Sequence, residues 1–103
     1  MKLQRWDKDS PPTVRELENV LRREGLGFYR WSDNPEVSYP WHTHPHPEVR
    51  WIISGSIKMG LRDGKEIVLN PGDRLDLPAN TEHWAKVVSR TPVVYLCASR
   101  DET

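Results

Sequence analysis

The sequence has little cysteine and no long apolar run. Its single cysteine, Cys97, cannot form an internal disulfide, so the fold does not depend on an oxidising compartment. We expect Cys97 to be a buried core residue with no neighbouring cation that would lower its pKa. The longest purely apolar run, residues 93–98, is too short to span a bilayer, and the first residues contain no apolar stretch typical of a signal peptide. We therefore expect a cytoplasmic protein.

An excess of either charge is also missing. Lys plus Arg and Asp plus Glu number 15 each, so the formal net charge is zero. Nucleic-acid-binding proteins carry a basic stripe that displaces counterions from phosphates, and polybasic blocks dock on membranes. The sequence has neither feature, so we expect no nucleic-acid and no membrane partner. A length of 103 residues is typical of one domain with a single core.

One amphipathic helix is predicted near the N-terminus. Residues 1–12 form a polar arm, and in residues 13–24 the apolar residues recur at helical spacing. Thr13 followed by Glu16 is typical of a capping box, and Gly25 is placed to end the helix. Such a short helix is marginal alone, so its apolar face must pack on another part of the protein.

The rest of the chain consists of short β-prone runs separated by turn residues. The predicted strands are residues 28–31, 37–43, 49–54, 56–61, 65–69, 73–77, 83–88 and 92–98. Asp63-Gly64 lies between two of them and predicts a β-hairpin with a type I′ turn. Many short strands with frequent turns predict an all-β sandwich or barrel. We divide the chain into an arm and helix, residues 1–27, and a β-domain, residues 28–103.

Four histidines and one glutamate suggest a metal site. His42, His44 and His46 fall within five residues, and Glu48 follows two positions later. Imidazole nitrogen and carboxylate oxygen suit a divalent Fe, Mn, Ni, Co or Zn ion. In an extended segment alternate residues share a face, so His42, His44 and Glu48 are predicted to point the same way, and a neighbouring strand would add His83. The alternative is that His42 and His44 are exposed residues of a proline-rich loop.

The spacing of these residues resembles a known family. Residues 42–55 read His-x-His-x-x-x-Glu-x-x-x-x-x-x-Gly, and residues 72–83 read Gly-x-x-x-x-x-Pro-x-Asn-x-x-His. Both patterns resemble the two motifs of the cupin superfamily, whose members are small jelly-roll (double-stranded β-helix) barrels. The resemblance covers roughly residues 28–98. It implies that His42, His44, Glu48 and His83 bind a metal inside a cupin-type barrel, with the helix outside the motif region.

Three positions depart from the family pattern. Glu36 stands six residues before His42, where a glycine often opens the first motif. Asn80 replaces the usual glycine of the second motif, and Val87 replaces its closing asparagine. Asparagine tolerates the left-handed backbone conformation, so the turn at Asn80 is expected to survive. None of the three departures affects a candidate ligand.

Two further polar residues are candidates for ligand binding. Arg50 follows Glu48 by two and is predicted to face the same interior. A buried guanidinium must be paired, either with a protein carboxylate such as Glu48 or Asp76 or with the carboxylate or phosphate of a ligand. His46 lies between two prolines, and it is either a proton shuttle at the mouth of the pocket or a solvated residue near the metal ligands.

The aromatic residues divide into two predicted groups. Tyr29 and Trp31 share one face of the first strand of the β-domain and are candidates to line the mouth of the pocket. Trp41, Trp51 and Trp84 are predicted on the side of their strands that faces away from the metal. Packing against the helix or burial in a dimer interface is the expected role of these three tryptophans.

Two functions from different classes fit these residues. In the first, the metal keeps positions open for a substrate or O₂, and the resemblance implies an oxygenase, isomerase or decarboxylase. In the second, the barrel is a non-catalytic small-molecule or metal-binding module. A purely structural zinc is a weaker third option, because such sites usually contain thiolate ligands. We expect a metal-bound barrel with a small anionic ligand, such as a carboxylate-bearing one, and leave catalysis open. The resemblance and the tryptophan content lead us to expect a homodimer.

Overall fold

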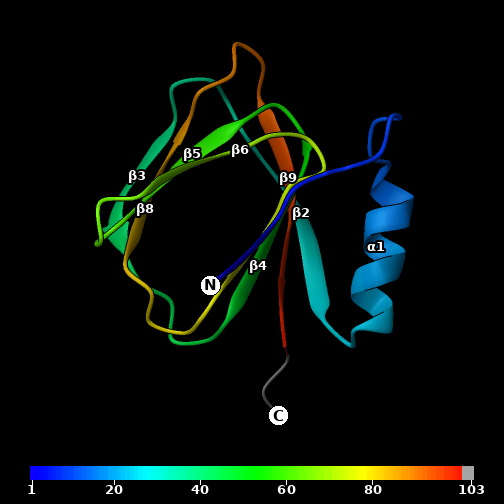
Figure 1. Cartoon of the computed structure of the whole chain (residues 1–103), viewed down its shortest axis with the longest axis horizontal. Coiled ribbons are helices and arrows are strands. Elements are labelled where there is room, and N and C mark those ends of the chain that lie inside the picture. Colours follow the sequence, from blue (N-terminus) through cyan, green and yellow to red (C-terminus); the bar gives the residue numbers. More distant parts are fainter. Residues whose placement is uncertain (101–103) are drawn as a thin grey trace.

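The computed structural model of the protein describes residues 1–100 and contains two antiparallel sheets and one helix (Figure 1). The five-stranded sheet has the order β1-β7-β4-β9-β2, and the four-stranded sheet has the order β3-β8-β5-β6. In chain order the elements are β1 (Lys2–Gln4), α1 (Val14–Arg23), β2 (Gly27–Asp33), β3 (Ser38–His42), β4 (Glu48–Ser54), β5 (Ile57–Leu61), β6 (Glu66–Leu69), β7 (Arg74–Leu77), β8 (His83–Val87) and β9 (Val93–Ser99). The predicted jelly-roll architecture is confirmed, although the barrel consists of two facing sheets rather than one continuously hydrogen-bonded cylinder.

All eight predicted strands are present, and their ends differ from the prediction by at most two residues. The structure adds β1, which lies within the segment that the sequence suggested was a polar arm. Leu3 of β1 pairs with Leu75 of β7, so the segment becomes the edge of the five-stranded sheet. Its three residues are all exposed and show no apolar alternation, so backbone pairing alone makes this strand. The pattern of side chains therefore could not predict β1.

The predicted helix and its capping box are confirmed. The Thr13 hydroxyl accepts a hydrogen bond from the Glu16 N–H, and the Glu16 carboxylate accepts one from the Thr13 N–H at 2.8 Å. The pKa of the Glu16 carboxyl is lowered, mainly by that backbone hydrogen bond. Gly25 follows the helix with φ +76°, the left-handed conformation that glycine adopts without cost. The described chain has no helix long and apolar enough to cross a membrane.

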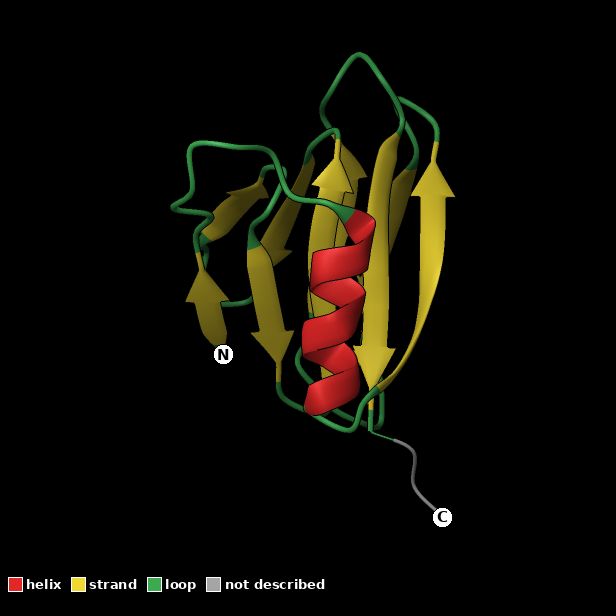
Figure 2. Cartoon of the chain, turned by 90° about the vertical axis from the view of Figure 1, so that its right-hand side faces the viewer, coloured by secondary structure: helices red, strands yellow, loops and turns green. Residues whose placement is uncertain are grey.

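The helix packs on the outer face of the five-stranded sheet, as Figure 2 shows. Leu17 and Leu21 are buried there against Val49, Trp51 and Leu96. Full burial of a leucine side chain contributes about 1.5–3 kcal/mol, so these two residues anchor the helix. The second apolar cluster fills the space between the two sheets, and it contains the inward-facing residues of β4, β5, β8 and β9.

The Asp63-Gly64 hairpin is confirmed, but its turn type is not the predicted one. The turn joins β5 to β6, and a type I′ turn needs positive φ at both central residues. Gly64 has φ +90°, whereas Asp63 is not among the residues with positive φ. The Gly64 N–H donates to the Leu61 carbonyl, which is typical of a type I turn followed by a glycine bulge. The Asp63 carboxylate favours this turn by accepting from the Lys65 N–H at 2.9 Å.

Two non-glycine residues of the described chain have a left-handed backbone, and both stand where the resemblance would place glycine. Asn80 has φ +62°, so the turn at this position is confirmed. Its N–H donates to the His44 carbonyl at 2.7 Å and so joins the loops of the two motifs. Glu36 has φ +72°. The backbone of the family motif is therefore kept at Glu36 even though the glycine is missing.

Candidate metal centre

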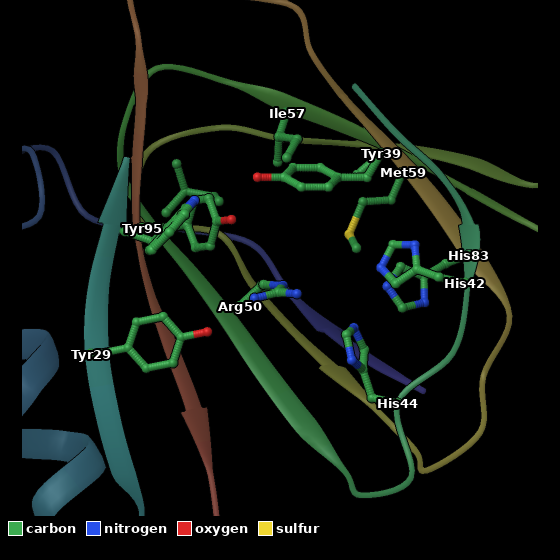
Figure 3. A pocket seen from close by; sticks show the side chains of 12 residues that line it. Tyr29, Tyr39, His42, His44, Arg50, Ile57, Met59, His83 and Tyr95 are labelled. Atoms are coloured by element: carbon green, nitrogen blue, oxygen red, sulfur yellow. The ribbon is translucent and has the colours of Figure 1, made fainter. Parts of the chain in front are cut away.

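Strand pairing brings the two motifs together. His42 ends β3 and His83 begins β8, and these two residues are direct cross-strand partners. His44 lies in the loop after β3. One ligand-type nitrogen from each of these three histidines lies within 4.8 Å of the others, and the three rings lie close together in Figure 3. The structure therefore assembles a three-histidine group at one end of the space between the sheets.

The sequence predicted that His42, His44 and Glu48 come together because they alternate along one strand, and the structure brings them together in a different way. His42, His44 and Glu48 do not share the face of a single extended segment, because β3 ends at His42 and β4 begins at Glu48 in the other sheet. The chain instead crosses from one sheet to the other through residues 43–47. His44 projects toward the group from that crossing loop.

Backbone carbonyls orient two of the imidazole rings. His83 Nδ1 lies 2.8 Å from the Thr81 carbonyl oxygen, and His42 Nδ1 lies 2.6 Å from the Pro40 carbonyl oxygen. A carbonyl only accepts hydrogen bonds, so Nδ1 of each neutral ring carries the proton and Nε2 keeps its lone pair. Metal-binding histidines commonly have such a partner on the second nitrogen.

Two buried nitrogen atoms of this group have no hydrogen-bond partner. The Nε2 atoms of His44 and His83 are buried and form no hydrogen bond, and His83 is only 1 % exposed. Burial lowers the pKa of both imidazoles, which favours the neutral form that binds metals. Unpartnered buried polar atoms are rare in folded proteins. The donor set therefore fits a divalent transition metal.

Glu48 lies beside the three histidines rather than within their group. It is buried, and its Oε2 atom lies 3.4 Å from His44 Nε2 and 3.2 Å from an Arg50 terminal nitrogen. Its Oε1 atom lies 3.4 Å from His46 Nε2. Oε2 is also buried without a hydrogen bond. Its role as a fourth ligand stays a prediction.

Arg50 faces the interior, as its spacing from Glu48 predicted. Its side chain is 16 % exposed and lies 5.3 Å from the Tyr95 ring centroid. Of the two candidate protein partners, the structure places Glu48 beside Arg50, whereas Asp76 pairs with Arg74 at 2.8 Å. Figure 3 shows the Arg50 guanidinium in the middle of the cavity.

Cys97 is buried, as predicted, but it has a cationic neighbour, which the sequence did not suggest. Arg50 and Cys97 are cross-strand partners on β4 and β9, and an Arg50 N–H donates to the sulfur at 2.7 Å. The contact forms because β4 and β9 pair in this register. The two strands are far apart in sequence, so the residues next to Cys97 do not reveal the contact. Burial nevertheless raises the pKa of the Cys97 thiol and outweighs the opposing effect of Arg50.

The cavity beside the histidines measures about 280 Å³. It is lined by Tyr29, Trp31, Tyr39, His42, His44, Arg50, Ile52, Ile57, Met59, His83, Ala85 and Tyr95. Tyr29 and Trp31 are about half exposed at its edge, where the sequence placed them. His46 contacts Glu48 but does not line the cavity. Tyr39 was missed because a bulge between Tyr39 and His42 breaks the alternation along β3.

A second buried carboxylate, Asp33, binds three of the aromatic residues that line the cavity. It was not predicted from the sequence. Asp33 is 7 % exposed and accepts hydrogen bonds from Tyr39 at 2.8 Å, Trp31 at 2.9 Å and Tyr95 at 3.3 Å. Its partners come from β2, β3 and β9, and no local motif marks such a residue. The available signal was that Asp33 follows Trp31 by two residues on β2 and therefore shares its face.

The tryptophans on the outer faces behave differently from one another. Trp51 packs against the helix cluster, and its indole N–H donates to the Gly72 carbonyl at 2.9 Å. Trp41 and Trp84 belong to the other sheet, which the helix does not cover. Trp84 lies over Gly60, and the Arg62 guanidinium lies 4.0 Å from the Trp41 ring centroid.

These features agree with the comparison to known proteins. A profile for the cupin domain matches residues 29–99, and the chain belongs to the cupin family. A solved protein from Thermotoga maritima shares the fold at 20 % identity and a TM-score of 0.65, over 93 % of this chain and 94 % of that protein. A DMSP lyase from Ruegeria pomeroyi shares it at 24 % identity and a TM-score of 0.66, over 76 % of this chain and 39 % of the lyase. At these identities the likeness concerns the fold alone.

Two curated proteins match a short segment of the chain at higher sequence identity than these structures. Acireductone dioxygenase from Leptospira biflexa is 46 % identical over 46 residues, which cover 42 % of this chain. The same enzyme from Exiguobacterium sibiricum is 40 % identical over 47 residues. The match spans 26 % of either enzyme's length, so it concerns only part of these proteins.

Proposed function

We propose that this protein is a divalent-metal cupin in which His42, His44, Glu48 and His83 hold the ion. The observation that carries this proposal is that the buried Nε2 atoms of His44 and His83, within the three-histidine group, form no hydrogen bond. Fe, Mn, Ni, Co and Zn all suit these donors. Thiolate ligands are missing from the group, which disfavours a purely structural zinc site.

Arg50 is the proposed anchor of a small anionic ligand. Its guanidinium has five N–H donors, and the contacts to Cys97 and Glu48 leave others directed at the cavity. A divalent metal would more than balance the charge of Glu48, which leaves the positive charge of Arg50 for a carboxylate. The guanidinium fork suits two carboxylate oxygens at once. His46 lies on the far side of Glu48, where it would steady that carboxylate and not the ligand itself.

Oxygenase chemistry is the reaction we propose, in preference to isomerase or decarboxylase chemistry. The local likeness to acireductone dioxygenases supports this choice. A bound metal would supply a Lewis acid or, if it is iron, a centre that reacts with O₂. The residues of the chain would bind the ion, orient an anionic substrate through Arg50, and keep water out with Ile52, Met59 and the surrounding aromatic rings. A non-catalytic binding module is the alternative.

One experiment separates these proposals. Protein loaded with Fe(II) or with redox-inert Zn(II) is titrated with a panel of small 2-hydroxy and 2-oxo carboxylates, while heat release and O₂ consumption are recorded. We expect carboxylate binding with both metals, O₂ consumption with Fe(II) alone, and loss of binding with retained metal in Arg50→Gln. Binding without O₂ consumption across the panel would instead favour the non-catalytic module. Unchanged binding in Arg50→Gln would exclude Arg50 as the anchor.

A homodimer and a cytoplasmic location remain part of the proposal. Trp41 is 40 % exposed on the sheet that the helix leaves uncovered, and aromatic residues are enriched in interfaces. Light scattering after size-exclusion chromatography would report the mass. A monomer at micromolar concentration would exclude the dimer.

A further inference from the structure

We infer that the ligand of this site carries a short apolar tail next to its carboxylate, and not a chain of hydroxyl groups. The inference rests on the proposed function and adds the class of ligand. It comes from the layer of side chains that lies next to the histidines and Arg50 along the strands. This layer is called the apolar layer below and consists of Trp31, Ile52, Ile57, Met59, Ala85 and Tyr95.

Strand alternation places the apolar layer directly beside the polar end of the cavity. On β8 the inward-facing residue after His83 is Ala85, and on β4 the one after Arg50 is Ile52. Two residues along a strand correspond to about 6.6 Å, the length of a few bonded carbon atoms. Met59 of β5 is the cross-strand partner of Ala85 and continues the layer on the neighbouring strand.

Figure 3 shows the same separation of polar and apolar side chains. Ile57 and Met59 lie on one side of the cavity, and His44 lies on the opposite side with Arg50 between them. A carboxylate held by Arg50 would therefore leave the rest of its molecule facing Ile57 and Met59. Both side chains are at least nine-tenths buried, so water does not readily reach this wall.

Asp33 takes up the donor hydrogens of the aromatic residues near this layer. Tyr39, Tyr95 and Trp31 each have one side-chain hydrogen to donate, and each donates it to the Asp33 carboxylate. The indole N–H and the two hydroxyl hydrogens are thus unavailable to a ligand. These three residues therefore offer a ligand ring carbon and, on the two tyrosines, hydroxyl oxygens that can only accept.

The consequence is a preference between ligands of equal charge and size. An apolar tail gains free energy when it leaves water for this layer. A hydroxylated tail would leave its hydroxyl groups facing Ile52, Ile57 and Met59, and each buried hydroxyl without a partner weakens binding by about tenfold. A cavity of about 280 Å³ limits the tail to a few carbon atoms.

A matched pair of probes tests the inference. 2-Hydroxyisocaproate and threonate share a 2-hydroxycarboxylate head, the same charge and the same number of non-hydrogen atoms, so they differ only in the tail. Each is titrated calorimetrically into the Zn(II)-loaded protein. We expect 2-hydroxyisocaproate to bind at least about tenfold more tightly. Equal affinities, or tighter binding of threonate, would overturn the inference and leave the proposed function intact.

Substitution of Met59 tests whether the apolar layer causes the preference for the apolar probe. Met59→Gln keeps the shape of the side chain and adds an amide to the apolar layer, so the preference should fall several-fold, whereas the apolar control Met59→Leu should keep it. An unchanged preference in folded M59Q would also contradict the inference, and if M59Q does not fold, the wild-type comparison decides alone. Failure of both probes to bind the Zn(II)-loaded protein, or failure of the protein to load Zn(II), would instead overturn the proposed function and this inference with it.

Discussion

Tyr39 donates a 2.8 Å hydrogen bond to Asp33 and thereby joins the edge strands of the two sheets. Asp33 ends β2, the edge of the five-stranded sheet, and Tyr39 lies on β3, the edge of the four-stranded sheet. These strands share no backbone ladder. The side-chain contact between Tyr39 and Asp33 is therefore part of what closes the cavity on this side.

Replacing Asp33 by asparagine should destabilise the protein by about 1–3 kcal/mol. The amide has one acceptor oxygen where the carboxylate has two, and its NH₂ group would face donors. Urea unfolding at neutral pH measures the change. Ser32→Ala, on the exposed outer side of β2, is the control and should leave the midpoint within error. An equal midpoint for Asp33→Asn and wild type would show that the Asp33 contacts contribute nothing.

Glu36→Gly should stabilise the protein by up to about 1 kcal/mol. Glu36 has φ +72°, which costs a residue with a Cβ atom about 1–2 kcal/mol, and the greater freedom of glycine in the unfolded chain offsets part of the gain. Glu36→Ala keeps the Cβ atom and serves as the matched control. Thermal unfolding compares the three proteins. A lower melting temperature for Glu36→Gly than for Glu36→Ala would contradict the assignment of strain to this position.

The Glu24–Arg74 pair should make stability depend on pH. Arg74 donates two hydrogen bonds to the Glu24 carboxylate, at 2.6 and 2.8 Å, and they lower the pKa of Glu24. Because the folded pKa lies below the unfolded value of about 4.3, the stabilisation is present above that pH and is lost as the pH falls through the folded pKa. Urea midpoints of wild type and Glu24→Gln should therefore differ at pH near 7 and converge in acid.

A matched variant isolates this effect from general acid unfolding. Glu18→Gln removes a carboxylate from the same helix, and the nearest Arg22 nitrogen lies 3.9 Å away. The difference between Glu18→Gln and wild type should stay small at both ends of the pH range. A Glu24→Gln difference that grows toward acid pH would have the wrong sign for the contact with Arg74.

Gly60→Ala should cost about 1–3 kcal/mol. A Cβ atom at this position would lie 2.0 Å from Trp84 Nε1 and 2.1 Å from its Cε2, so the indole ring would have to move. Chemical unfolding followed by tryptophan fluorescence reports both the stability and the shift of the ring. The same substitution in a Trp84→Leu background should cost much less. Equal costs in both backgrounds would show that Trp84 is not the obstacle.

Much of the fold followed from local patterns. The capping box at Thr13 and the alternation of Ile57 and Met59 each identified an element that the structure contains. β1 was missed because its pairing with β7 uses backbone groups and leaves its side chains exposed. The type I′ turn was wrongly predicted because the Asp63 side chain stabilises a different turn with the same two residues.

Some residues of the candidate site were likewise predicted from local patterns, and others were not. The histidines were found because their spacing is a motif, and Arg50 because it lies on the same strand as Glu48. The contacts of Asp33 with Tyr39 and Tyr95 depend on register between strands far apart in sequence, and so does the pairing of Arg50 with Cys97. The spacing of residues along the chain cannot predict such contacts.

The most direct test of the central claim is elemental analysis of the untagged protein beside two histidine variants. After incubation with Fe(II) or Zn(II) and removal of free ions, we predict near-stoichiometric metal in the wild type and in His46→Gln, since His46 lies outside the three-histidine group. His83→Gln should retain almost none, because it loses a buried Nε2 donor. Circular dichroism verifies that each variant is folded. Equal metal in folded His83→Gln and wild type, or a wild type that loads neither ion, would contradict a metal centre at these histidines.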